Sequence, residues 1–365
     1  PLPPSLTDLQ IVTPNGYVPQ QALPVQAFFQ LTRLSCYLPT HFFRTLPQTL
    51  TDLSVQGTQP TLAMSDIAQL PVGLRNLSLA CLTRRLRAHG SDPVLPFRHL
   101  EKWDAPEIDL TYSINQVEVL TKNPGLTFFG APIFRPDSKL LSQLPASLRH
   151  IKVYTGMGAI HLYSTNSIVL LPPLLAEWHL DLDKPTQHAD ILGELPADFR
   201  LPHTLCELHL RLEHGIGILD STLATLLSGN GTLRVFSSNA KTISDDGILH
   251  FKVPSLTSLT LTKAKLSPAC FKHLPRDLRL LCLSGCHDDP KKLFEDLPPK
   301  LESLTLGGAK IDRSVLPYLP KQASITFVYL SANRILKHDF TRELPANMTK
   351  AGTIFKTHIW KHPNY

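Results

Sequence analysis

LPRDLRLLCL, which begins at Leu274, and LPPKLESLTL, which begins at Leu297, follow one pattern, L-P-x-x-L-x-x-L-x-L. The same pattern recurs in LPQTLTDLSV from Leu46, in LPVGLRNLSL from Leu70 and in LPHTLCELHL from Leu201. A single short match would be coincidence, but many matches at a near-constant spacing indicate a repeat architecture. The search for fold and function therefore starts from the repeat.

The first leucine of each L-x-x-L-x-L segment gives a register mark, and successive marks lie about 24 residues apart on average. The run from Leu205 to Ile325 matches the pattern well, whereas Leu31, Leu100, Leu126 and Met348 are weak matches. In chain order, the marks are Leu6, Leu31, Leu50, Leu74, Leu100, Leu126, Leu148, Leu175, Leu205, Leu233, Leu256, Leu278, Leu301, Ile325 and Met348.

The spacing of the leucines predicts a strand in every repeat. The last two leucines of L-x-x-L-x-L are two residues apart, so in an extended chain both point to the same side. One such strand cannot bury its leucines alone, and it needs the strand of the next repeat beside it. We expect Leu259, Leu281 and Leu304 to lie on neighbouring strands and to share one interior.

The remainder of each repeat must return the chain to the start of the next parallel strand. Ser267-Pro268 places an N-cap serine and a first-turn proline ahead of ACFKHL. Helix starts are also expected at Asp220 before LATLL, at Ser244 before GILHF and at Asp312 before RSVLPYL. The predicted fold is an α/β solenoid shaped as a horseshoe, with a concave parallel sheet and short helices and irregular turns on the convex face.

The repeat accounts for nearly the whole chain. We expect residues 1–356 to form one array of about 14 to 15 coils, with an irregular stretch over 101–172 where the marks are weakest. Residues 357–365 are predicted to be a C-terminal tail.

The chain resembles leucine-rich-repeat proteins, chiefly the ribonuclease-inhibitor-like and cysteine-containing subclasses found in F-box proteins. LRLLCLSGC, from Leu278 to Cys286, has the form L-x-x-L-x-L-x-x-C, and ITFVYLSANRI from Ile325 has the related form with Asn333. The resemblance implies a non-enzymatic scaffold that binds a partner protein on the concave sheet. An alternative by analogy alone is the substrate-recognition part of an F-box-type ubiquitin ligase.

We expect no enzymatic activity and no cofactor. The sequence contains no G-x-S-x-G, H-E-x-x-H, P-loop or G-x-G-x-x-G motif. Cys282 and Cys286 are spaced like a metal pair, but their register positions point in opposite directions, so the two sulfurs cannot share one ion. We therefore expect no metal there.

The charge of +6 leaves open a second alternative, a basic nucleic-acid binder. The densest basic run is Arg84, Arg85, Arg87 and His89, which we expect to be a solvated turn. Nucleic acid is therefore an alternative to a protein partner and not the first expectation.

The six cysteines are scattered, which favours reduced thiols and an intracellular location, cytoplasmic or nuclear. No run of apolar residues is long enough to span a membrane. Because the chain starts at Pro1 and not at Met, secretion after removal of a signal peptide stays open.

Positions three, five and seven of each repeat, counted from the mark, should face the concave surface. In the middle of the chain these positions are polar and partly aromatic, and we expect them to form a partner-binding patch. Phe327 and Tyr329 give a second, apolar candidate, whereas Trp103 and Trp178 fall at core positions. The patch residues are His150, Lys152, Tyr154, Glu177, His179, Asp181, Glu207, His209 and Arg211.

Four of these residues also suggest a zinc hypothesis. Glu177 and Glu207 share position three, and His179 and His209 share position five. Two imidazoles beside carboxylates can bind zinc. On a solvated sheet such pairs more often hydrogen-bond to each other, so we expect no metal here either.

Overall fold

The computed structural model describes residues 3–11, 29–57, 64–81, 96–105, 120–132, 144–155, 171–182, 191–192, 201–212, 217–284, 290–307, 327–331 and 350–352. Several sequence predictions lie outside these residues. They are the basic run at 84–89, the helix after Asp312, the residues Cys286 and Asn333, and the tail 357–365.

The chain forms two compact units, Pro1–Thr186 and Gln187–Tyr365, which we call unit 1 and unit 2 and describe separately. The prediction of a single array over 1–356 stays a prediction. Each unit is built on a parallel sheet in which the strands follow one another in chain order, the short two-stranded sheet of unit 2 apart.

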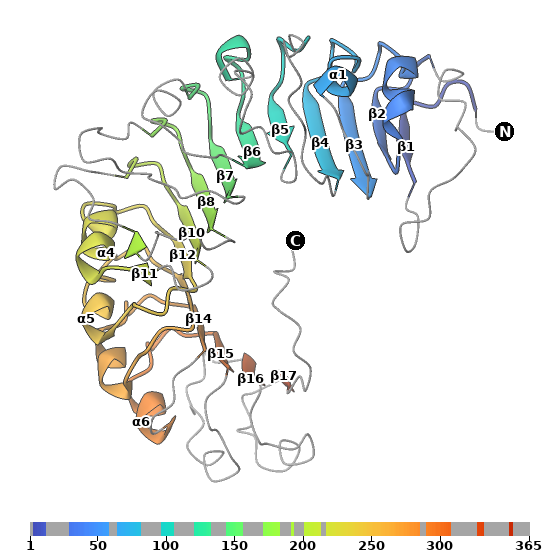
Figure 1. Ribbon diagram of the computed structural model, residues 1–365. Helices are drawn as coiled ribbons and strands as arrows, with labels where there is room; N and C mark the ends of the chain where they lie inside the picture. The colour runs from blue at the N-terminus through green and yellow to red at the C-terminus, as the bar shows by residue number, and fades with distance from the viewer. Residues whose placement is uncertain are drawn as a thin grey trace. The chain divides into compact units, whose positions relative to one another are not determined.

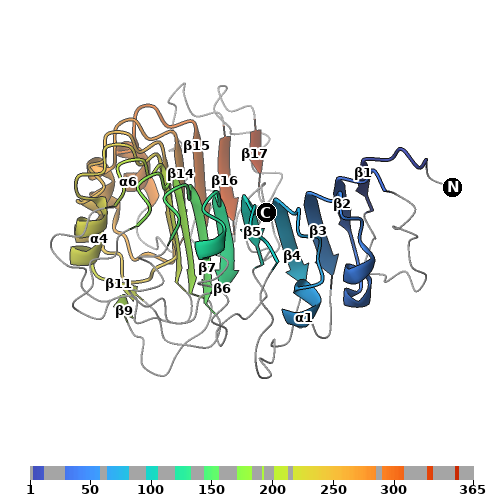
Figure 2. The same ribbon diagram turned by 90° about the horizontal axis from the view of Figure 1, so that it is seen from above.

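Unit 1 consists of short parallel strands with short helical segments between some of them (Figure 2). The helical segments are η3 (Thr40–Thr45), a 3-10 helix, and α1 (Met64–Ile67). The strands are β1 (Asp8–Gln10), β2 (Arg33–Cys36), β3 (Asp52–Gly57), β4 (Asn76–Cys81), β5 (Lys102–Asp104), β6 (Phe128–Pro132), β7 (His150–Thr155) and β8 (Glu177–Leu182).

Unit 2 repeats this plan, and its helical segments lie on one side of its strands (Figure 1). The strands of its main sheet are β10 (Glu207–Leu212), β12 (Val235–Ser238), β13 (Ser258–Thr262), β14 (Leu280–Ser284), β15 (Ser303–Gly307), β16 (Phe327–Ser331) and β17 (Lys350–Gly352). The helical segments are α4 (Asp220–Leu227), α5 (Asp245–Ile248), η4 (Pro268–His273) and α6 (Pro290–Glu295). A separate two-stranded sheet pairs β9 (Ile191–Leu192) with β11 (Gly217–Ile218).

The register of the strands confirms the register marks in both units. In unit 2, Leu259 is aligned with Leu281 and Leu281 with Leu304, and all three side chains are fully buried. The weak marks obey the same register, because the residue two places after Leu100 is aligned with the residue two places after Leu126. Each unit is therefore a leucine-rich-repeat solenoid.

The Leu-Pro step has a clear local role. The backbone N–H of the mark leucine donates to the carbonyl of the proline three residues earlier, as Leu50 does to Pro47 at 3.1 Å and Leu301 to Pro298 at 3.1 Å. This hydrogen bond closes a tight turn directly before the strand, and proline suits it because its fixed φ limits the conformations available. Where the Leu-Pro step is present, the turn sets the start of the following strand.

Hydroxyl side chains join successive coils beside this turn. Thr49 Oγ1 donates to the Leu31 carbonyl at 2.8 Å, and Ser147 Oγ donates to the Leu126 carbonyl at 2.8 Å. In unit 2, Ser255 Oγ donates to the Leu233 carbonyl at 2.7 Å. These bonds satisfy carbonyls next to the sheet that would otherwise depend on solvent.

The helical segments expected at Asp220, Ser244 and Ser267 are present in the described part of unit 2, with one difference. Leu223, Leu226 and Leu227 of α4 are buried, and the Ser244 hydroxyl caps α5 by accepting from the Asp246 N–H at 3.2 Å. Ser267 precedes a 3-10 helix, not an α-helix, and its hydroxyl donates to Asp245 of the preceding coil instead of capping its own helix.

No helix among the described residues is long and apolar enough to cross a membrane.

Candidate binding surface of unit 1

Two rows of side chains lie on the sheet face of unit 1 that carries positions three and five. The first row aligns Lys102, Phe128, His150 and Glu177, and the second aligns Asp104, Gly130, Lys152 and His179. Neighbouring strands in a sheet are about 4.8 Å apart, so aligned side chains can contact one another. Gly130 has no side chain, and we call the other seven residues of the two rows the β5–β8 patch: Lys102, Asp104, Phe128, His150, Lys152, Glu177 and His179.

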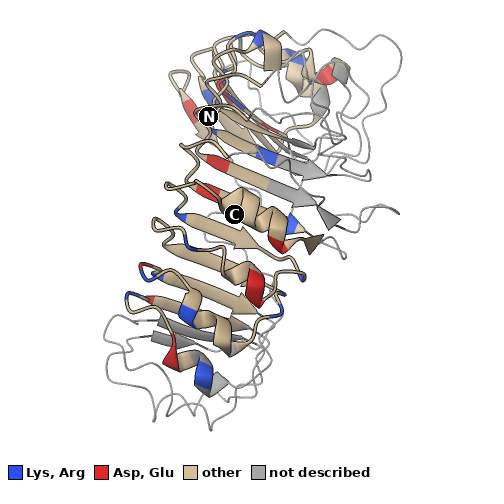
Figure 3. Cartoon of the chain, turned by 90° about the vertical axis from the view of Figure 1, so that its left-hand side faces the viewer, with Lys and Arg blue, Asp and Glu red and all other residues tan. Residues whose placement is uncertain are grey.

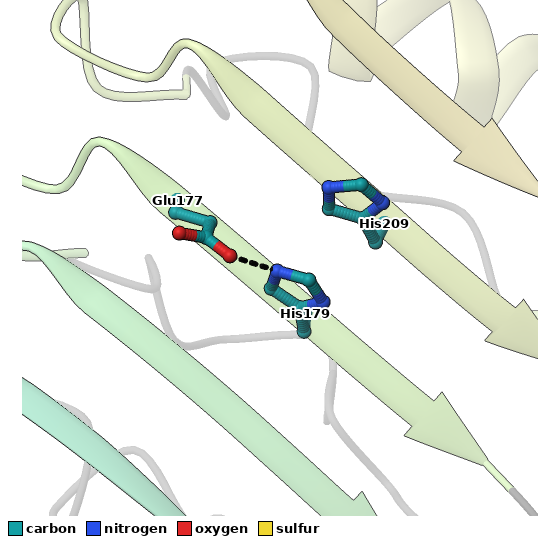
Figure 4. A group of neighbouring side chains, drawn as sticks. All are labelled: Glu177, His179 and His209. Carbon is teal, nitrogen blue, oxygen red and sulfur yellow. Dashed lines mark hydrogen bonds and ion pairs between the residues drawn. The ribbon is translucent and has the colours of Figure 1, made fainter. Parts of the chain in front are cut away.

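Glu177 connects two histidines in this patch. His150 Nδ1 lies 2.8 Å from Glu177 Oε2, across the boundary between β7 and β8. His179 Nε2 donates to the other carboxylate oxygen, and Figure 4 shows these two side chains on the same face of β8. Each imidazole thus uses a ring N–H to bind one oxygen of the same carboxylate.

The pKa of Glu177 is lowered to about 2 by these contacts. The hydrogen bond from His179 is the largest cause, the bond from His150 and the charges of both imidazoles act in the same direction, and burial opposes them. Glu177 is therefore ionised at any pH near neutrality and holds both imidazoles in place.

Phe128 lies at the centre of the charged part of the patch. Lys102 Nζ is 4.8 Å and Lys152 Nζ is 5.6 Å from the centroid of its ring. The ring is half-buried, and its centroid is also 6.1 Å from that of the His150 ring. Ammonium groups at these distances are attracted to the ring face.

Gly130 makes this arrangement possible. A Cβ atom on Gly130 would lie 2.7 Å from Asp104 Oδ1 and 3.2 Å from Phe128 Cε1, so both side chains occupy space that any other residue would fill. Asp104 Oδ2 is also 3.7 Å from Lys102 Nζ. The glycine therefore lets an acidic and an aromatic side chain meet above the strand.

The position of Asp104 disfavours the ionised form of its carboxyl group. Burial raises the pKa of its carboxyl, while the charges of Lys102 and Lys152 and a hydrogen bond from Lys102 lower it in part. The two lysine neighbours therefore offset part of the effect of burial on this pKa.

The bases of the patch are more exposed than the acids with which they pair. The Lys102 side chain is 40% exposed against 21% for Asp104, and the His150 side chain is 39% exposed against 24% for Glu177. His179, at 15%, is the exception. Lys102 and His150 are therefore more accessible to an approaching partner than the carboxylates with which they pair.

Six of the nine residues predicted from the sequence lie on β7 and β8 of unit 1. His150, Lys152, Glu177 and His179 belong to the patch, and Tyr154 is aligned with Asp181 further along the same strands. The side chains of Tyr154 and Asp181 lie outside the described ones.

The remaining three predicted residues lie on β10 of unit 2. His209 Nε2 is 3.4 Å from Glu207 Oε2, and Arg211 is exposed; Figure 4 also draws His209. A patch of nine residues needs side chains from both units, so it stays a prediction, and so does the expectation that Glu177, Glu207, His179 and His209 hold no zinc.

Lys102, Asp104 and Phe128 were not predicted as site residues. Their marks, Leu100 and Leu126, were already assigned, and counting two and four places from each reaches all three residues. Leu100 and Leu126 match the repeat pattern only weakly, which makes these positions harder to assign from the sequence. The polar and aromatic rows therefore begin two strands earlier than predicted.

The corresponding face of unit 2 differs in kind. Strands β12 to β15 carry no Lys, Arg, Asp or Glu, as their tan colour in Figure 3 reflects, and Leu280 is 41% exposed. Cys282 and Thr305, expected at the surface in position five, are both buried, and burial raises the pKa of the Cys282 thiol to about 12. The side chains of Phe327 and Tyr329 lie outside the described ones.

No protein-family model matches the chain, and no curated protein matches it. Among solved structures, an internalin from Listeria monocytogenes is 16% identical, with a TM-score of 0.44, over 91% of this chain and 89% of its own. A leucine-rich-repeat protein of Leptospira interrogans is 16% identical, with a TM-score of 0.45, over 96% of each chain. The repeat register described above, and not these similarities, defines the fold.

Proposed function

We propose that this chain is a protein-binding scaffold without bond chemistry of its own, and that the β5–β8 patch contacts the partner. The patch supports this proposal by its composition, because it combines a half-buried aromatic ring with exposed basic groups on a rigid sheet. Aromatic side chains are enriched among the residues that contribute most to binding energy.

The same patch offers little to a nucleophilic enzyme. Its side chains are lysine, aspartate, phenylalanine, histidine and glutamate, so it supplies no hydroxyl or thiol for a histidine to activate. Glu177 instead uses both oxygens to hold two imidazoles. An arrangement that fixes side chains in place suits recognition.

The finer assignments remain part of this proposal. The ribonuclease-inhibitor-like or cysteine-containing subclass rests on LRLLCLSGC and ITFVYLSANRI, and an F-box role rests on analogy with it. Intracellular location rests on the scattered cysteines, of which Cys36, Cys206, Cys270 and Cys282 are free thiols. Glu207, His209 and Arg211 are retained as candidate contacts on β10.

Site-specific photocrosslinking tests the location of the partner. A benzophenone-bearing phenylalanine placed at Phe128 keeps an aromatic ring on the sheet, and the same residue placed at the exposed Ser65 of α1 serves as the matched control. We expect a partner protein to crosslink from position 128 and not from position 65. Equal crosslinking from both positions, or none from position 128, would reject the β5–β8 patch as the contact surface.

A further inference from the structure

We propose that the partner presents an acidic polypeptide segment whose Asp or Glu carboxylates bind near Lys102 and Lys152, against the Phe128 ring. This inference rests on the proposed function and adds the chemistry of the partner to it. Three observations carry it: the position of the two ammonium groups, the depth of the carboxylates and the half-buried ring.

The two lysines converge on one point of the sheet although they come from different strands. Lys102 is on β5 and Lys152 is on β7, yet both Nζ atoms are within 5.6 Å of the centroid of the same ring. Around Phe128, two ammonium groups thus surround a single carboxylate, that of Asp104. These three side chains carry a net positive formal charge, although Glu177, at the end of its row, makes the whole patch neutral when the histidines are neutral. Around Phe128 the local field therefore attracts an anion.

The two acidic side chains of the patch, Asp104 and Glu177, are less exposed than the bases Lys102 and His150, with which they pair, so the outer part of the surface is basic. Glu177 also has each of its oxygens bound by an imidazole. An approaching group therefore meets nitrogen bases first, and complementary charge on the partner is negative.

The aromatic ring favours a polypeptide over a plain anion. Phe128 is only half-buried and has two ammonium groups near its ring, and covering its exposed part with an aliphatic or aromatic side chain would be favourable. A segment that alternates acidic and apolar residues supplies both contacts. It would lie across the strands, with carboxylates toward the lysines and apolar side chains toward the ring.

A nucleic acid fits the same surface poorly. A phosphate backbone carries a negative charge at every nucleotide, and its binding depends on neutralising several of them with cations. Here Asp104 begins one row and Glu177 ends the other, so each row of bases has a carboxylate at one end. Successive phosphates would meet carboxylates as well as ammonium groups.

Fluorescence anisotropy with the full chain tests the inference. The acidic probe is a short labelled peptide in which Glu and Asp alternate with Leu and Val, and its neutral counterpart has Gln and Asn in place of the acids. A labelled RNA of similar length is the third probe. We expect the acidic peptide to bind more tightly than the other two, and its affinity to fall as salt is raised.

Two variants with opposite expected effects distinguish a change in binding from misfolding. In the double variant Lys102→Met, Lys152→Met, both ammonium groups are lost while the aliphatic stems remain, and we expect affinity for the acidic peptide to fall about tenfold. Asp104→Asn removes the competing carboxylate, and we expect the same affinity to rise a few-fold. The control Lys241→Met, Lys272→Met changes net charge equally at two exposed lysines of unit 2 and should bind as wild type.

The outcomes separate the two proposals. Equal binding of acidic and neutral peptides, wild-type affinity in the Lys102 and Lys152 variant, or preferential binding of RNA would each overturn the acidic-segment inference. Crosslinking from position 128 would still stand in those cases, so the scaffold proposal would survive. Absence of that crosslinking, with the acidic peptide still bound preferentially, would instead reject the β5–β8 patch as the contact surface for the partner protein.

Discussion

The sheet faces of β5–β8 in unit 1 and β12–β15 in unit 2 are built on the same repeat, yet they have different chemistry. Both align the residues at positions three and five in straight rows. In unit 1 the rows carry lysines, histidines, acids and a phenylalanine, whereas in unit 2 they carry serine, threonine, valine, leucine and cysteine. The leucines of the pattern fix the coil, and the residues between them are free to define what each face binds.

The largest effect should come from a change in the buried leucine interior, which both units have. Leu281→Asp places a carboxylate among fully buried leucines, and we expect unit 2 to lose about 4 kcal/mol or more of stability. Thr260→Asp, at a half-buried position of the neighbouring strand β13, is the matched control and should cost far less. Urea denaturation followed by circular dichroism measures both, and similar midpoints would contradict the assigned interior.

A second change tests the buried position five of unit 2. Thr305 is aligned with Cys282 and is only 5% exposed, whereas Thr260 of the same row is half-buried. Thr305→Asp should therefore cost about 1–3 kcal/mol, clearly more than Thr260→Asp. If the two variants unfold at the same urea concentration, the two positions do not differ in burial.

These contrasts show which features the sequence could predict. The spacing of the leucines was sufficient to assign the described strands of the main sheets, their register and the buried Trp103 and Trp178, because burial at those positions follows from periodicity alone. It did not predict the separate pair β9 and β11. Even the weak marks Leu100 and Leu126 predicted the observed alignment of β5 with β6.

The contacts on the open faces could not be predicted in the same way. Whether Glu177 binds His150, His179 or both depends on side-chain rotamers across two strands. The meeting of Asp104 and Phe128 depends on the absence of a side chain at Gly130, which no periodicity reveals. The burial of Thr305 likewise depends on its neighbours, because position five of β13 is half-buried.

The histidine pair gives unit 1 a pH dependence. Because the folded-state pKa of Glu177 is lowered to about 2, its ionised form stabilises the fold above the ordinary value of 4.5, and this contribution is lost as pH falls toward 2. Glu177→Gln should therefore destabilise unit 1 by about 1–3 kcal/mol near pH 7, and the difference from wild type should vanish near pH 2.

The matched control for this change lies in unit 2. Glu302 Oε1 is 3.4 Å from Arg279 Nη1, but both side chains are more than half exposed. Glu302→Gln should change stability little at any pH, because exposed ion pairs contribute little. Thermal melts of both variants at several pH values decide the matter, and a pH-independent cost for Glu177→Gln would contradict the assigned carboxylate role.

The smallest expected effect distinguishes a glycine that the patch requires from one that it does not. At Gly130 a methyl group would lie 2.7 Å from Asp104 Oδ1, so Gly130→Ala must displace Asp104 or Phe128, at a cost of about 1 kcal/mol. At Gly125 nothing lies within 4 Å of the added atom, and Gly125→Ala should be close to neutral. Because the displaced side chains belong to the β5–β8 patch, Gly130→Ala should also reduce crosslinking from position 128, while Gly125→Ala should leave it unchanged. Wild-type crosslinking in the Gly130 variant would mean that partner binding does not depend on the arrangement of Asp104 and Phe128.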